Sequence, residues 1–319
     1  MKQFEQFCNE RNLRSLPAEP VTVAEFMRWA AFDRKPKPLT ANVAARTLRA
    51  AISDWHKQNR LPTPTNDPLV KSAAEAIRRT GRKGPGPKDP LTADIFQSMI
   101  RLNDNSLMDF RDLHMISLMT SVLTRAEEVV ALKWSDIKLD TITTKSGEVE
   151  ERMNVFIGKR KNDQHRIGDS FPIGKADDPQ ICPINWHKWY KEMHEFFCTF
   201  CRDLKDNEQS KYLFHNHKTG EPLSKHTPRH IVKAWITRIG GNPTRFASHS
   251  ARRGGATAIA ASGVDFRLLK RHGGWRSDTA PAMYIDDSAE DRLNTAKAVW
   301  STAKPTASIT QDNRPRSKR

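Results

Sequence analysis

The chain has 319 residues, of which 37% are hydrophobic, and 53 Lys and Arg against 37 Asp and Glu give it a formal net charge of +16. That length suits two domains, and the excess positive charge suggests a polyanionic partner such as nucleic acid. No apolar run of about 18 residues occurs and the first residues lack the apolar segment of a signal peptide, so we expect neither a membrane span nor secretion. The four cysteines do not form a disulfide framework, which favours a reducing compartment, either prokaryotic cytoplasm and nucleoid or a eukaryotic nucleus.

The segment 1–80 has the pattern of a small helical domain. Three of its stretches place apolar residues at three- and four-residue intervals, and Thr40 and Asp67 are candidate N-caps. Trp29 and Trp55 lie within this periodicity, which favours core positions over stacking on nucleic-acid bases.

Residues 81–90 interrupt the helical pattern. Gly and Pro alternate there with cations, which predicts an interdomain linker. Arg82, Lys83 and Lys88 could lie along a phosphate backbone or be solvated without contacts, and the sequence leaves both interpretations open.

The segment 91–301 is predicted to form a second domain, and the polar, basic tail at 302–319 is expected to be disordered. Helices are expected at 92–102 and 108–121. Apolar strands on both sides of a polar turn in MNVFIGKRKNDQHRIGDSFPI predict a β-hairpin. The predicted fold class is therefore mainly α, with a helical N-terminal domain and an α+β second domain that has a small antiparallel sheet.

A long amphipathic helix is predicted at 183–204. Cys198 and Cys201 form a CxxC near its end, and His215 and His217 follow, so a zinc site has to be considered. There is no second CxxC, and an HxH pair is tighter than the usual histidine spacing of zinc fingers. We therefore expect no metal ligands and no cofactor.

The stretch HSARRGGATAIAASGVDFRLLKRHGGWRSDTAPAMY, which ends at Tyr284, carries the strongest chemical signal. His249 and Arg252 are three residues apart, so on a helix, predicted near 250–262, they share a face and can address one anion. Two glycines then allow a tight bend that brings Trp275 to the same place.

The chain has three tyrosines. Tyr190 and Tyr212 lie in apolar contexts, where a phenol is most simply a core or half-buried side chain. Tyr284 alone follows a run of cations, histidine and glycine, which singles it out.

The order HSAR, GGW and Tyr resembles the C-terminal active-site block of the tyrosine recombinases, the integrase family, and is most similar to Cre-type members. The 23 positions from Arg252 to Trp275 and the 9 from Trp275 to Tyr284 fit that pattern without an insertion. Most members have a second histidine where this chain has Trp275, which can donate an indole N–H but cannot act as a base.

The resemblance also implies an arginine after an apolar helix, with an acidic residue three positions later, and Arg125 and Glu128 match it. Many members have Gly-Leu or Gly-Met before that arginine, whereas this chain has Leu123-Thr124. A catalytic lysine is implied in the hairpin. Lys161 matches best, and Lys159, two residues away on the same face of a strand, is the alternative and a candidate DNA contact.

These matches imply a role for each residue. Arg125 and Arg252 would bind the nonbridging oxygens of a phosphodiester, and Glu128 would orient their neighbourhood. His249 would accept the phenolic proton of Tyr284 or bond the phosphate, while the lysine would protonate the leaving 5′ hydroxyl. The product would be a 3′-phosphotyrosyl DNA.

The implied activity is site-specific recombination of double-stranded DNA through a Holliday junction, by a homotetramer on two DNA sites. Segment 1–80 would be the core-binding domain, which closes a C-shaped clamp on DNA with the catalytic domain. Residues 288–300 would form a further helix, packed on a neighbouring protomer or on its own domain. A type IB topoisomerase and a noncatalytic DNA-binding protein derived from a recombinase remain as alternatives.

Overall fold

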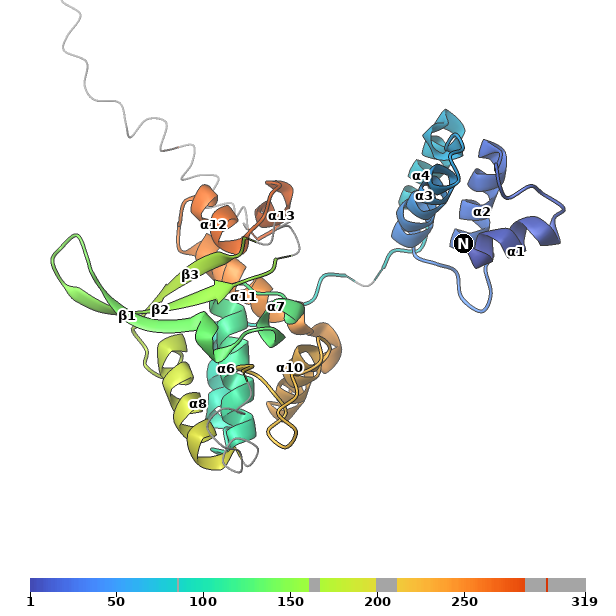
Figure 1. Cartoon of the computed structure of the whole chain (residues 1–319). Helices are drawn as coiled ribbons and strands as arrows, with labels where there is room; N and C mark the ends of the chain where they lie inside the picture. Colours follow the sequence, from blue (N-terminus) through green and yellow to red (C-terminus); the bar gives the residue numbers. More distant parts are fainter. Residues whose placement is uncertain (85, 161–166, 199–210, 285–296, 298–319) are drawn as a thin grey trace, which may run out of the picture. The chain divides into compact units, whose positions relative to one another are not determined.

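The computed structural model describes residues 1–84, 86–160, 167–198, 211–284 and 297, and the chain divides into two compact units, Met1–Pro87 and Lys88–Arg319 (Figure 1). The predicted helix at 288–300, apart from residue 297, and the tail at 302–319 lie outside these residues. Among the helices that are described, none combines the length and the apolar character needed to cross a membrane.

The first unit is a helical bundle. Its α-helices are α1 (Lys2–Glu10), α2 (Pro20–Phe32), α3 (Arg49–Gln58) and α4 (Pro68–Thr80), with a π-helical turn at Val43–Leu48 and a 3₁₀ turn at Pro64–Asn66. The predicted N-cap at Asp67 is confirmed, because its carboxylate accepts a 2.8 Å hydrogen bond from the Leu69 N–H. Trp29 and Trp55 pack against the apolar core, as their periodicity predicted.

The second unit contains the remaining elements. Its helices are α5 (Ala93–Arg101), α6 (Leu107–Ser121), α7 (Ala126–Val130), α8 (Pro183–Phe197), α10 (Thr227–Arg238), α11 (Ser248–Ala261), α12 (Phe266–Gly273) and α13 (Thr279–Ala282), with 3₁₀ turns at Trp134–Asp136 and Pro243–Arg245. Every residue from Leu113 to Met119 is buried, as expected of a helix surrounded by others. Helix α6 contacts α7, α8, α10 and α11 and is the centre of this unit.

A three-stranded antiparallel sheet, in the order β1-β2-β3, completes the second unit (Figure 1). Its strands are β1 (Ile137–Thr143), β2 (Val149–Ile157) and β3 (Asp169–Gly174). The β2–β3 pairing, from Arg152 opposite Gly174 to Ile157 opposite Asp169, is the predicted hairpin. The mainly α fold with a small antiparallel sheet is therefore confirmed.

Two glycines let α11 lie directly on its neighbours. A Cβ atom added to Gly255 would overlap the carbonyl oxygen of Thr120 at the end of α6, and one added to Gly254 would overlap that of Leu91. The Leu91 N–H donates a 2.9 Å hydrogen bond to the carbonyl of Ser250 in the first turn of α11. This close contact fixes the helix that carries the HSAR sequence.

We expect Gly255→Ala to lower the free energy of unfolding by about 1–3 kcal/mol, because the added methyl group has no space between α11 and α6. Gly174→Ala is the control, since open space surrounds that position and its φ is negative. Urea unfolding of both variants measures the difference. Equal stability of the two would contradict the packing described here.

Candidate active site

Arg252 is the buried centre of the predicted site. Only 1% of its surface is exposed, and its guanidinium donates hydrogen bonds to the carbonyls of Leu123 and Gly273, the latter at 2.7 Å. Burial, followed by the nearby charge of Arg125, lowers its pKa to about 10, so Arg252 stays protonated at pH 7. Within the described part of the chain no carboxylate forms an ion pair with it.

Leu123 has an unusual backbone for its residue type. Its φ of 54° lies in the left-handed region that favours glycine. Leucine therefore stands at a backbone position that is typical of glycine. The Leu123 side chain is buried in a small cluster with Ala256, Leu269 and Tyr284, which offsets a strain of about 1–2 kcal/mol. The turn directs the Leu123 carbonyl at Arg252.

Arg125 is held by Glu128, three residues later in α7. One carboxylate oxygen accepts a hydrogen bond from the Arg125 backbone N–H and the other from its Nη1, both at 2.8 Å. The Glu128 side chain is 1% exposed and that of Arg125 is 22% exposed. The buried carboxylate therefore holds the arginine on its protein side and leaves part of the guanidinium accessible to solvent.

His249 lies in the first turn of α11, near both arginines. The His249 side chain is accessible to solvent, but many protein atoms surround it, and this partial desolvation lowers its pKa. The positive charges of Arg252, Arg125 and Arg253 lower the pKa further. His249 is therefore neutral at pH 7 and can accept a proton. It lines a depression of about 280 Å³ together with Arg125 and with Lys225 and His226.

Trp275 connects the buried arginine to the candidate nucleophile. The guanidinium carbon of Arg252 lies 4.6 Å from the centre of the Trp275 ring, and the ring centres of Trp275 and Tyr284 are 5.4 Å apart. Tyr284 is 7% exposed and follows α13. Residues from α11, the end of α12 and the end of α13 thus meet at one place.

The predicted lysines and linker cations differ in their exposure and contacts. Lys161 lies outside the described residues. Lys159 is exposed just beyond β2 and lines a depression of about 290 Å³ with acidic neighbours, among them Glu128. Arg82 and Lys83 are exposed, whereas the Lys88 amine donates a 2.7 Å hydrogen bond to the carbonyl of Thr244.

Arg160 was not among the predicted residues, although it lies beside them. It is 7% exposed, and its guanidinium carbon is 4.2 Å from the centre of the Phe171 ring. Its Nε and Nη1 atoms are buried and have no hydrogen-bond partner among the residues that the structure describes, and burial lowers its pKa. Its charge acts on Arg252. Arg160 lies between Lys159 and Lys161, the two candidate lysines, and this position was the signal in the sequence.

Lys225 and His226 were also missed. They immediately precede α10, whose start at Thr227-Pro228 has the proline that is typical of a first helical turn. A helix-start signal in the sequence could have identified them as residues at the positive end of a helix dipole, where anions bind.

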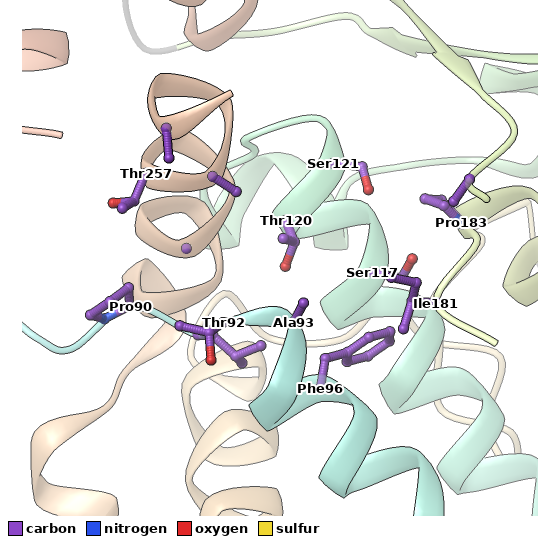
Figure 2. Close-up of a pocket in the computed structure, with 15 residues that line it drawn as sticks. Pro90, Thr92, Ala93, Phe96, Ser117, Thr120, Ser121, Ile181, Pro183 and Thr257 are labelled. Carbon is purple, nitrogen blue, oxygen red and sulfur yellow. The ribbon is translucent and has the colours of Figure 1, made fainter. Parts of the chain in front are cut away.

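A further, mainly apolar pocket of about 380 Å³ lies beside α11 (Figure 2). Thr92 and Phe96 of the α5 region, Ser117 and Thr120 of α6, and Thr257 of α11 contribute to its wall. None of the predicted site residues lines it, so its position does not coincide with the chemistry described above.

Comparison with known proteins agrees with this geometry. The model of the phage integrase family matches residues 90–291. An integrase/recombinase xerD homolog of Selenomonas ruminantium is 25% identical over 288 residues, which cover 89% of this chain and 78% of that relative.

Two solved structures show the same fold. The XerH site-specific recombinase bound to difH substrate, in a pre-cleavage complex, has a TM-score of 0.59 at 15% identity and covers 93% of this chain and 76% of its own. The Tn1549 transposon integrase in complex with transposon right end DNA has a TM-score of 0.56 at 14% identity, covering 89% and 85%. Because the family model spans well over half of the chain, the protein belongs to the phage integrase family of tyrosine site-specific recombinases.

Proposed function

We propose that this protein cuts and rejoins double-stranded DNA at specific sites through a 3′-phosphotyrosyl intermediate on Tyr284. The observation that carries the proposal is that Trp275 contacts both the buried Arg252 guanidinium and the Tyr284 ring, so a charged anion site adjoins a phenol. The assigned catalytic residues are Arg125, Lys161, His249, Arg252, Trp275 and Tyr284, with Glu128 as a positioning residue and Lys159 as the alternative lysine.

The arginines supply the phosphate site. Arg252 is a buried cation bonded to neutral carbonyls, and such a charge gains most from an anion that enters its low-dielectric surroundings. Arg125 adds a second planar fork of donors from the solvent side. Together they would stabilise the extra negative charge of a pentavalent phosphorus.

The chemistry then needs two proton transfers. The Tyr284 oxygen attacks the phosphorus and its proton passes to the neutral His249 ring, while the bond from phosphorus to the 5′ oxygen breaks. That oxygen takes a proton from Lys161, or from Lys159, and leaves as a 5′ hydroxyl. The Trp275 indole N–H can donate to a phosphate oxygen but cannot accept the proton. Attack by a 5′ hydroxyl reverses the sequence and reseals a strand.

DNA is the proposed partner. Relatives with this fold have been solved bound to DNA substrates, and the net charge of +16 fits binding to a polyanion. Segment 1–80 is assigned as the core-binding domain, with Arg82, Lys83 and Lys88 of the linker as candidate phosphate contacts. The exchange would proceed through a Holliday junction within a homotetramer that holds two DNA sites.

Replacement of the proposed nucleophile is the first test. With a nicked suicide DNA substrate found by selection, the wild-type protein should form an SDS-resistant adduct. Tyr284→Phe should form it at least about 10³-fold more slowly, because no other group can take over the covalent bond.

Tyr212→Phe is the matched control, because it removes a phenol elsewhere in the same domain and should leave the adduct unchanged. Binding of the selected DNA by gel shift shows that each variant is folded. An adduct that persists in Tyr284→Phe would overturn the assignment, and binding without any adduct in the wild type would favour the noncatalytic alternative.

The pH dependence of cleavage tests His249. Its lowered pKa keeps the ring neutral to a lower pH than an ordinary histidine, so the fall of the cleavage rate with acid, at low DNA concentration, should lie below the ordinary histidine range. His249→Gln should lose this acid limb and slow cleavage about 10²-fold. Identical pH profiles for the two proteins would exclude His249 as the proton acceptor.

Arg160→Met separates stability from function. Two of its three buried guanidinium nitrogens have no hydrogen-bond partner among the described residues, so the substitution should raise the free energy of unfolding by about 1 kcal/mol or leave it unchanged. Cleavage should nevertheless slow by roughly tenfold, because a positive charge beside Arg252 is lost. Urea unfolding and cleavage rates measure both effects. Lower stability together with unchanged cleavage would contradict this assignment, and Arg160→Lys should retain more activity than Arg160→Met.

A further inference from the structure

A cluster of metal-ligating side chains lies outside the active site, at the end of α8. We propose that His194, Cys198 and His215 bind a zinc ion. One donor atom from each residue lies within 4.8 Å of the other two, and all three side chains are buried. No step of the proposed recombination chemistry uses them.

Local structure brings the first two ligands together. His194 and Cys198 are four residues apart at the end of α8, so they share one face of the helix. The Cys198 N–H still donates a 3.0 Å hydrogen bond to the carbonyl of His194. His215 is 21 positions after His194 in the sequence, in the segment that leads to α10. The tertiary fold therefore supplies the third ligand.

Two of the three distances between the donors match those around a tetrahedral zinc ion. Bonds of about 2.05 Å to nitrogen and about 2.3 Å to sulfur place two nitrogens about 3.3 Å apart and a nitrogen and a sulfur about 3.6 Å apart. The His194 and His215 Nε2 atoms are 3.2 Å apart, and the His215 Nε2 atom is 3.6 Å from the Cys198 Sγ. These atoms could therefore bind zinc with little movement.

The hydrogen bonding of His215 fixes the correct ring nitrogen for a ligand. Its Nδ1 is 3.0 Å from the carbonyl oxygen of Tyr212, which can only accept, so Nδ1 carries the hydrogen. The lone pair is therefore on Nε2, the atom that faces His194 and Cys198. Bonding of the second ring nitrogen to a backbone carbonyl is typical of zinc-bound histidine.

The donor set of one thiolate and two imidazoles suits Zn²⁺ better than hard cations, which prefer oxygen. Such an ion would join the end of α8 to the segment around Tyr212, which is paired with Lys133 in an isolated β-bridge. In Figure 1 the end of α8 lies at the bottom of the second unit, away from α12 and α13. An ion at this place would therefore take no part in the chemistry proposed for Tyr284.

A zinc ion at this place differs from the expectation of no metal ligands. The sequence drew attention to Cys198 with Cys201 and to His215 with His217. Cys201 lies outside the described residues, and the His217 Nε2 atom is 3.2 Å from the Tyr190 hydroxyl. The decisive partner is His194, whose HxxxC spacing is also that of an ordinary amphipathic helix.

Metal content and cobalt spectroscopy test the proposal. The full-length protein is purified without chelators, exposed to excess zinc and dialysed. Elemental mass spectrometry should then find close to one zinc ion per chain. Replacement of zinc by Co²⁺ should give a thiolate-to-cobalt charge-transfer band and visible bands of tetrahedral intensity.

Cys198→Ser should lose the charge-transfer band and most of the zinc, whereas Cys182→Ser should retain both. Cys182 is the matched control because it is equally buried and lies at the other end of α8. His194→Gln should weaken zinc binding by about 10-fold or more. Circular dichroism establishes that each variant is folded.

A wild-type protein that retains no zinc and gives no cobalt bands would overturn the proposal, whatever the variants do. Zinc that remains fully bound in folded Cys198→Ser would overturn it as well, since the ion would then lie elsewhere.

Discussion

The proposed active site depends on one buried cation, the guanidinium of Arg252, which is held by backbone carbonyls and, among the described residues, by no carboxylate. Carbonyl dipoles orient the charge without neutralising it, so its attraction for an anion is retained. The glycine contact between α11 and α6 sets the depth of Arg252, and the left-handed turn at Leu123 supplies one of its carbonyl partners. The packing of α11 on α6 and the turn at Leu123 therefore both position this residue.

The same unit contains two polar clusters with different electrostatics. Around Arg252, three arginines act on one another, and among the described residues the acidic side chains that act on them are Glu128 and, for Arg160, Asp169. The excess of positive charge favours an anionic substrate. At the end of α8, burial lowers the pKa of His194 to about 4 and that of His217 to about 3, so these rings are neutral at pH 7. The first cluster suits phosphate chemistry, and the second suits a structural cation or a hydrogen-bonded core.

The sequence predicted the fold class, the hairpin and the family because these depend on local pattern and spacing. The block from His249 to Tyr284 lies within 36 consecutive residues, so its order could be compared directly with a known motif. Arg160 and the contribution of His194 could not be found in this way. An arginine in a polar turn resembles a solvated cation until Phe171 and Gly274 are packed around it, and His194 acquires its neighbour His215 only through the tertiary fold.

The most direct measurement is mass spectrometry of the proteolysed protein–DNA adduct, which identifies the side chain that carries the nucleotide. The account predicts a nucleotide mass on the peptide that contains Tyr284, attached through the tyrosine oxygen, with a free 5′ hydroxyl on the released strand. A nucleotide on Tyr190, Tyr212 or a residue that is not tyrosine, or linkage to a 5′ phosphate, would contradict it.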